Sequence, residues 1–147
     1  MRESYDMAVK LTLGLEGMGS RAVDVGDGCG LTKYGICEKW NPKIDVKNLT
    51  INQAKQIYLT KYWIPAGCDA QPFPMDICLF DSQVNPQNDP KLLGGGNQEI
   101  LNLHPRNWQE YNIFRMQRYM RCSKPQFVKG HIFRVLNLCN EIVKLGG

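Results

Sequence analysis

Apolar residues recur at helical spacing along most of the chain, and this periodicity restricts the fold more than any other feature of the sequence. Positions three or four residues apart are apolar in five segments, residues 3–15, 48–63, 74–85, 105–121 and 123–144. As a helix, each segment has one apolar stripe, and the stripes must pack together to leave water. Residues 20–36 break the pattern with glycine and aspartate, so a loop with a short hairpin is expected there. The sequence therefore predicts a mainly α fold with a small β or loop element.

The chain is long enough for one packed domain made of two regions. It has 147 residues, of which 43% are hydrophobic, so a substantial core can form. Residues 94–96 are consecutive glycines and mark the best internal boundary. We expect residues 1–93 to form the first region and residues 94–147 a helical C-terminal region packed on it.

Short patterns predict where individual helices begin. Thr50 and Gln53 have the spacing of a capping box, in which each side chain accepts a hydrogen bond from a backbone N–H of the first turn. Ser123 and Gln126 repeat that spacing before the last apolar segment. Pro105 suits a first helical turn, because the N–H that proline lacks has no partner there.

Charge is divided unevenly along the chain. Residues 1–100 hold 10 Lys/Arg and 12 Asp/Glu, whereas residues 101–147 hold 8 and 2. The basic C-terminal half suggests an anionic partner, such as a membrane surface or an acidic wall polymer, or else a solvated helix surface. We place Arg115, Arg118 and Arg134 on such a solvated face. The sequence has no nucleic-acid-binding motif, so no nucleic-acid partner is expected.

Other classes of protein are disfavoured by what the sequence lacks. No apolar run approaches the roughly 20 residues that span a bilayer, so no integral membrane contact is expected. The six cysteines show no C-x-x-C spacing and are expected to be buried thiols rather than zinc ligands. Glu3 and Asp6 stand where a signal peptide needs positive charge, so synthesis in the cytoplasm without a signal peptide is expected.

Carboxylates are the best material for catalysis in this sequence. Glu16 ends an apolar helical segment and is flanked by Leu15 and Gly17. Partial desolvation there would keep its carboxyl protonated near neutral pH, as the general acid of glycoside hydrolysis requires. Asp24 or Asp27 could then orient water or stabilise the developing cation. On the residues alone, a glutamate at a helix end is more often a solvated surface residue, and the aspartates could be turn formers.

Four segments in order resemble the glycoside hydrolase family 108 muramidases, found among phage endolysins and bacterial export-associated lysozymes. The family opens with Glu-Gly-Gly and continues with Asp-x-Gly-Gly-x-Thr-x-x-Gly-Ile. This chain has EGM at residues 16–18 and DGCGLTKYGI at residues 27–36. The segments LTINQAKQIYLTKYW at 49–63 and LFDSQVN at 79–85 are similar to later motifs of the family. Residues 114–138 look like its companion region, usually called a peptidoglycan-binding domain.

The resemblance implies a lysozyme-like helical fold and an N-acetylmuramidase. Such an enzyme cuts the β-1,4 bond between N-acetylmuramic acid and N-acetylglucosamine in peptidoglycan. The family's catalytic glutamate falls on Glu16, with Asp27 and Thr32 as its expected helpers. The residues expected to bind substrate are Asp24, Gly30, Tyr34 and Asn85. No metal or organic cofactor is implied, because the mechanism needs only carboxylates and water.

The implied partner is the glycan strand of peptidoglycan, bound by a monomer. The expected place of action is the periplasm or cell wall, after release by a holin or another route outside the general secretion pathway. Two alternatives stay open. Met18 and Cys29 replace glycines of the family's pattern, which favours a catalytically impaired wall-binding or structural module of a phage or secretion system. A lytic transglycosylase also uses one glutamate but yields anhydromuramic products.

Residues near these motifs have structural interpretations as well. Thr32 could be a plain turn hydroxyl, and Tyr34 a core tyrosine. Tyr62 and Trp63 are expected in the core rather than at a binding surface. Asp81 is expected to tie helices together through buried hydrogen bonds.

Overall fold

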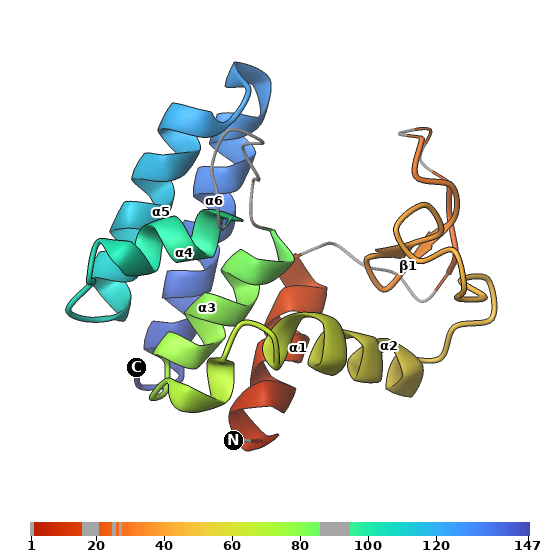
Figure 1. Ribbon diagram of the computed structural model, residues 1–147, viewed down its shortest axis with the longest axis horizontal. Helices are drawn as coiled ribbons and strands as arrows, with labels where there is room; N and C mark the ends of the chain where they lie inside the picture. The colour runs from red at the N-terminus through yellow and green to blue at the C-terminus, as the bar shows by residue number, and fades with distance from the viewer. Residues whose placement is uncertain (1, 16–20, 25, 27, 86–94) are drawn as a thin grey trace.

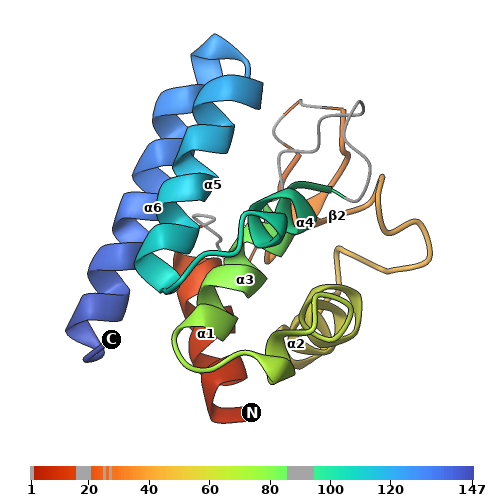
Figure 2. The ribbon, with the colours of Figure 1, turned by 60° about the vertical axis from the view of Figure 1, so that its left-hand side comes forward.

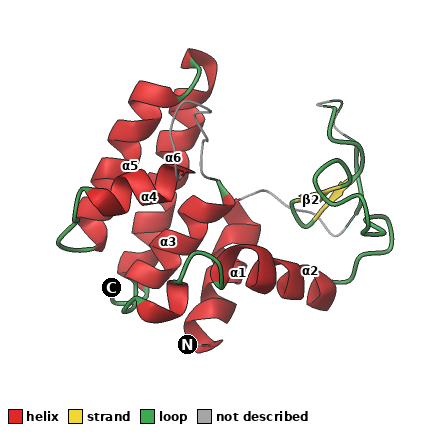
Figure 3. Cartoon of the chain, viewed as in Figure 1, coloured by secondary structure: helices red, strands yellow, loops and turns green. Residues whose placement is uncertain are grey.

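The computed structural model describes residues 2–15, 21–24, 26, 28–85 and 95–147. Its α-helices are α1 (Arg2–Leu15), α2 (Ile51–Tyr58), α3 (Met75–Val84), α4 (Gly95–Asn102), α5 (Trp108–Cys122) and α6 (Pro125–Lys144) (Figure 1). A π-helical turn η1 (Leu59–Trp63) continues α2, and a 3-10 turn η2 (Cys68–Ala70) precedes α3. The strands β1 (Thr32–Lys33) and β2 (Ile36–Cys37) form a small antiparallel hairpin (Figure 3). The predicted mainly α fold with a small β element is therefore confirmed, and it is consistent with a lysozyme-like fold.

Helix α3 lies at the centre of the helical part of the molecule (Figures 1 and 2). Every residue from Asp76 to Ser82 is buried, because α1, α4, α5 and the short turns η1 and η2 pack around it. Helices α5 and α6 form an antiparallel pair along one side, in which the rings of Tyr119 and His131 stack with centroids 4.8 Å apart. The hairpin and α2 lie on the opposite side of α1 and α3 in Figure 1.

Aromatic side chains form the centre of the core. Trp63 is 1% exposed, and its ring centroid lies 5.3 Å from that of Tyr5 and 5.6 Å from that of Phe80. Tyr62 is partly buried and packs against the same core. These edge-on and tilted contacts are the arrangements that aromatic pairs prefer. The expectation that Tyr62 and Trp63 belong to the core is confirmed.

The hairpin turns through two residues with left-handed backbone. Tyr34 has φ 50° and Gly35 has φ 74° between the paired residues Lys33 and Ile36, as a tight two-residue hairpin turn requires. Glycine adopts this conformation freely, but tyrosine does so only when other contacts hold it. The hydroxyl of Tyr58 on α2 donates to the carbonyl of Tyr34 at 2.6 Å. The hairpin is thereby fixed to α2.

The capping box at the start of α2 is confirmed. The Thr50 hydroxyl accepts from the Gln53 N–H at 3.2 Å, and the Gln53 side chain accepts from the Thr50 N–H at 2.9 Å. The second capping box, at Ser123 and Gln126, is wrong. Helix α6 begins at Pro125 without a side-chain cap, because proline fixes the backbone of the first turn. Ser123 instead ends α5, and its hydroxyl hydrogen bonds the His131 ring at 2.9 Å.

Two further boundaries differ from the sequence-based expectation. Helix α5 begins at Trp108 rather than at Pro105, because the Asn107 side chain accepts from the Glu110 N–H at 2.8 Å and caps the first turn. Helix α4 was not predicted, since glycines at its start disguise a helical segment. The predicted boundary between residues 1–93 and 94–147 falls on residues outside those described and stays a prediction.

The expectation of buried thiols is confirmed for three of the six cysteines, whereas Cys29, Cys122 and Cys139 are only half-buried. Cys37, Cys68 and Cys78 are buried. Burial raises the pKa of the Cys78 thiol to about 12, so it is neutral and unreactive at physiological pH.

Among the helices described, none combines the length and apolar character needed to cross a bilayer.

Candidate active site

A buried ionic cluster joins α3 to the two C-terminal helices, α5 and α6. Asp81 on α3 is fully buried and lies between Arg115 of α5 and Arg134 of α6. Its carboxylate oxygens are 2.8 Å from Arg115 Nη1 and 2.8 Å from Arg134 Nη2. Burial on its own would raise the pKa of Asp81, but the two guanidinium groups hold this pKa below its usual value. Asp81 is therefore an anion that ties helices together, as its structural interpretation predicted.

Of the three arginines assigned to a solvated helix face, Arg115 and Arg118 are buried and Arg134 is partly buried, so that expectation is wrong. Arg115 is 1% exposed and Arg118 is 2% exposed, and the side chain of Arg134 is 9% exposed. Arg115 and Arg134 compensate Asp81, whereas Arg118 donates from Nε to Glu99 of α4 at 2.8 Å. A buried carboxylate is stable only with a cation beside it, and that cation can come from another helix. Counting charges along the sequence does not reveal such pairs.

Helix α1 runs alongside α3 in the same direction, so the two helices end near each other. The Ser4 hydroxyl hydrogen bonds Asp76 near the start of both helices. The Thr12 hydroxyl lies 3.5 Å from an Asp81 oxygen about one turn before their ends. Figure 1 shows α1 and α3 side by side. The last residue of α1 directly precedes Glu16 in the sequence.

Asn85 ends α3 above the ionic cluster. Its N–H donates to the Asp81 carbonyl at 3.1 Å, and its carbonyl accepts from the Tyr119 hydroxyl at 2.7 Å. The Tyr119 hydroxyl in turn accepts from Arg115 Nε at 3.0 Å. The same network that pairs Asp81 therefore also fixes the backbone of Asn85, a predicted substrate-binding residue.

The hairpin carries three other predicted site residues. Gly30 has φ +74°, and a Cβ atom there would lie 2.6 Å from the Glu38 carboxylate, which accepts from the Leu31 N–H. Glycine is thus needed for the local backbone. Thr32 begins β1 and pairs with Val23 through two backbone hydrogen bonds of 2.8 and 3.0 Å. Gly30, Thr32 and Tyr34 therefore share one small unit that α2 anchors.

The predicted site residues come from two parts of the molecule, the segment around the hairpin and the helical part. Asp24 is exposed, and its carboxylate accepts from the Gly26 N–H at 2.9 Å, which is the pattern of an Asx turn. Asn85 belongs to the helical side together with the end of α1, whereas Gly30, Thr32 and Tyr34 belong to the hairpin. Glu16 and Asp27 lie outside the described residues, so their roles stay predictions. In the part of the chain that is described, no group of three His, Cys, Asp or Glu side chains is arranged to hold a metal ion.

The arginine partners of Asp81 were missed by sequence reasoning, although a signal existed. Arg115 is four residues after the buried Tyr111, and Arg134 is four residues before the buried Leu138. Positions four apart lie on the same helix face. A charged residue on a core-facing helix position is expected to have a buried partner of opposite charge. Applied to Arg115 and Arg134, this rule would have predicted that both are paired.

Comparison with known proteins identifies the family. A family model described as Glycosyl hydrolase 108 matches residues 9–86, more than half of the chain. The chain belongs to glycosyl hydrolase family 108. In this family 108 protein the match runs from α1 through the hairpin and α2 to the end of α3, and it contains every predicted site residue. The expected likeness of residues 114–138 to a peptidoglycan-binding region lies outside the match and stays a prediction.

No curated protein matches the family 108 chain, and no solved structure matches it. The assignment therefore depends on the family model and on the sequence motifs within residues 9–86. It makes the protein a glycoside hydrolase.

Proposed function

We propose that this family 108 protein is an N-acetylmuramidase, which hydrolyses the β-1,4 bond between N-acetylmuramic acid and N-acetylglucosamine in peptidoglycan. The family match over residues 9–86 is the observation that carries the proposal. Within that segment the sequence motifs resemble muramidases rather than glycosidases in general. A lysozyme-like arrangement of helices beside a small hairpin supports the same activity.

Glu16 acts as the general acid in the proposed mechanism. It protonates the glycosidic oxygen while positive charge develops at the sugar carbon, and water then adds to that carbon. Proton transfer needs a donor held at a defined place, since misplacement by about 1 Å can cost 100-fold in rate. Helix α1 is held by the core contacts of Tyr5 and by the hydrogen bond between Thr12 and Asp81. These contacts hold α1 in place, which supports the proposal that the residue after it, Glu16, delivers the proton.

A second carboxylate, Asp27 or Asp24, positions water or stabilises the cation in this mechanism. Asp24 is exposed to solvent, so its carboxylate can contact a water molecule. Thr32 and Tyr34 on the hairpin, with Gly30, contact the sugar from one side, and Asn85 contacts it from the helical side. Their fixed backbones, described above, support binding with little loss of conformational freedom.

The proposed setting is the cell wall. The substrate is the peptidoglycan glycan strand, and the enzyme acts as a monomer in the periplasm or wall after a holin or another route releases it. This part of the proposal depends on the substrate assignment and on the sequence-based expectation of cytoplasmic synthesis.

Replacement of Glu16 tests the mechanism directly. Glu16→Gln keeps the side-chain shape but removes the acid, so release of reducing ends from purified peptidoglycan should fall by about 100-fold or more. Glu3→Gln is the matched control, because Glu3 is exposed on the same helix and its replacement should leave the rate unchanged. Circular dichroism establishes that both variants fold.

Three outcomes would contradict the proposal. A folded Glu16→Gln protein with full activity would remove Glu16 from the mechanism. Anhydromuramic products in mass spectra of the fragments would identify a lytic transglycosylase. Binding of the wild-type protein to peptidoglycan without release of reducing ends would identify a wall-binding module.

A further inference from the structure

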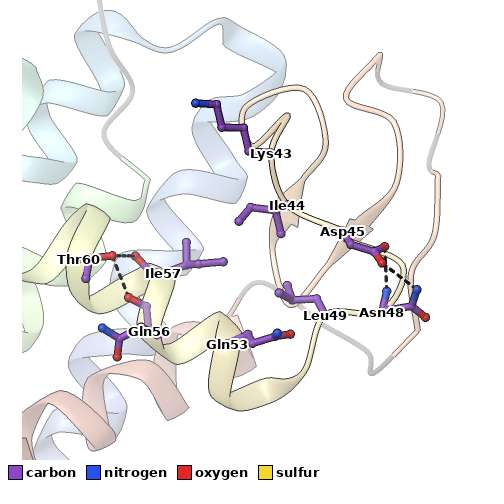
Figure 4. A pocket seen from close by; sticks show the side chains of 9 residues that line it. All are labelled: Lys43, Ile44, Asp45, Asn48, Leu49, Gln53, Gln56, Ile57 and Thr60. Atoms are coloured by element: carbon purple, nitrogen blue, oxygen red, sulfur yellow. Dashed lines mark hydrogen bonds between the residues drawn. The ribbon is translucent and has the colours of Figure 1, made fainter.

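A cavity of about 460 Å³ lies between residues 43–49 and the helical segment formed by α2 and η1 (Figure 4). Its volume is within the range of small-ligand sites. Ile44 and Leu49 extend from one wall toward Ile57 on the other, so the interior is apolar. The remaining lining residues are polar, namely Lys43, Asp45, Asn48, Gln53, Gln56 and Thr60.

The polar rim offers hydrogen-bonding groups of both kinds. Gln53 uses its carbonyl oxygen in the capping box of α2, which leaves its amide N–H₂ as a donor. Thr60 donates its hydroxyl proton to the Gln56 carbonyl at 2.9 Å, so its oxygen can still accept. Among the described residues, the side chains of Lys43 and Gln56 have no hydrogen-bond partner. The rim carries one cation, Lys43, and one anion, Asp45, and therefore suits an uncharged polar ligand better than a polyanion.

An exposed tryptophan precedes the segment that forms one wall of this cavity, although it is not itself a lining residue. Trp40 is 65% exposed, an unusual state for so large an apolar side chain. Lys61, next to Thr60, donates from Nζ to the Trp40 carbonyl at 3.2 Å and to Asn41 Oδ1 at 3.0 Å. The Asn41 carbonyl accepts from the N–H of Ile44, which lines the cavity, at 3.0 Å. These bonds fix the backbone of Trp40 close to one wall of the cavity, while the Lys39 ammonium lies 5.1 Å from the centroid of its exposed ring.

The combination of an aromatic ring, an apolar floor and an amide-rich rim matches the chemistry of a sugar. A pyranose ring has a face of C–H groups that packs on apolar surfaces, while its hydroxyl and acetamido groups form hydrogen bonds with amides and hydroxyls. We propose that Trp40 and this cavity form a second glycan-binding site, for a chain of β-1,4-linked N-acetylhexosamines. None of the residues that line the cavity is among those assigned to bond cleavage. The second site depends on the proposed function only for the source of the glycan.

The proposal predicts that Trp40 contributes to sugar binding. The probe is tetra-N-acetylchitotetraose, an uncharged β-1,4-linked chain, and its dissociation constant is measured by isothermal titration calorimetry. The full chain carrying Glu16→Gln is used, so that cleavage does not disturb the measurement. Trp40→Ala should weaken binding by about tenfold or more, because truncation of a ligand-contacting tryptophan removes much of its binding energy. Trp40→Phe, which retains a ring, should recover most of the affinity.

Phe133→Ala is the matched control. Phe133 is 52% exposed on α6 and has a lysine ammonium 5.6 Å from its ring centroid, as Trp40 has one at 5.1 Å, yet it lies on an element that does not line the cavity. The Phe133→Ala variant should therefore have the same dissociation constant for the tetrasaccharide as the protein with native Phe133. Thr60→Arg, which replaces an exposed wall residue with a bulky one, should weaken binding even if Trp40→Ala does not fold.

Contrary results are distinguishable from failure of the proposed function. Equal affinity of Trp40→Ala, Thr60→Arg and Phe133→Ala for the tetrasaccharide would overturn the second glycan site. Saturable binding of a stem tripeptide that Thr60→Arg abolishes, without binding of the tetrasaccharide, would reassign the cavity to the peptide part of the wall. Cleavage of peptidoglycan by the protein with native Glu16 is measured separately, and its loss bears only on the proposed function.

Discussion

Asp81 accepts contacts from three helices other than its own. Thr12 reaches it from α1, Arg115 from α5 and Arg134 from α6. A buried charge of this kind is stable only while its partners are present, because each ion has given up its hydration. Loss of the aspartate would leave two guanidinium groups buried without their anion. The side chain is therefore a positioning residue for α1, through its contact with Thr12.

Replacement of Asp81 should cost stability in a pH-dependent way. Asp81→Asn is expected to lower the free energy of unfolding by about 3–5 kcal/mol at neutral pH, as measured by urea denaturation. The pKa of Asp81 is lowered in the folded protein, so its contribution is fully present above the unfolded-state pKa, near about 4, and is lost as the pH falls below it. The difference from wild type should shrink accordingly in acid.

Asp6→Asn provides the comparison for that measurement. Asp6 is exposed on α1, and its replacement should change the free energy of unfolding by less than about 0.5 kcal/mol. A constant difference between wild type and Asp81→Asn from neutral to acidic pH would show that the ionised carboxylate is not what stabilises the cluster.

For single residues, the sequence allowed correct predictions where the neighbouring residues determine the role of a side chain. It predicted that Asp81 ties helices and that Trp63 is buried, because an aspartate among apolar neighbours and a tryptophan at a helix end restrict the possibilities. It did not find Arg115 and Arg134, because the partner of a buried charge lies far away in sequence. The environment of Glu16 likewise depends on segments that meet only in the folded chain, so its role remains a prediction.

Helix boundaries show how local signals compete. The patterns at Thr50 and Ser123 have the same spacing, yet only Thr50 caps a helix. At the second site, Pro125 starts α6 and leaves Ser123 at the end of α5. Propensity also failed for α4, whose glycines suggested a loop, because contacts with α3 and α5 override the weak preference of its first turn.

The cap of α2 can be tested by one substitution. Thr50→Ala removes the acceptor for the Gln53 N–H and should lower the free energy of unfolding by about 1 kcal/mol. Thermal denaturation should show this as a fall in Tm of about 2–4 °C. Thr60→Ala makes the same chemical change within η1 and should have less than half this effect, since its hydroxyl bonds a carbonyl already used by the helix. Equal losses would contradict a capping role.

Across the whole molecule, ion pairs engage most of the cations of the basic C-terminal half. Six of its eight cations are paired, which are Arg106, Arg115, Arg118, Arg121, Arg134 and Lys144. Their partners include Asp81 and Glu99, which precede this half in the sequence. Among the described residues, Lys124 and Lys129 remain as exposed cations without an ion pair. With these two carboxylates the excess charge of this part of the molecule falls from +6 to +4, and Arg115 and Arg118 are buried away from the surface.

Binding to peptidoglycan should accordingly depend little on salt. Between about 0.05 and 0.5 M NaCl, where the screening length falls below 10 Å, the fraction that sediments with sacculi should fall by less than about twofold. The double variant Lys124→Gln and Lys129→Gln should remove most of the remaining dependence. A decrease of tenfold or more in wild type would mean that the paired arginines bind the wall.

Asp81 and its cations also limit how this chain can be recombined. The carboxylate belongs to the segment that family 108 defines, whereas both guanidinium groups come from helices beyond it. A chimera that joined residues 1–93 to another tail would bury an anion without a counterion, and α5–α6 fused elsewhere would carry two stranded cations. The C-terminal helices are therefore not an interchangeable module. A functional chimera must keep Asp81, Arg115 and Arg134 together.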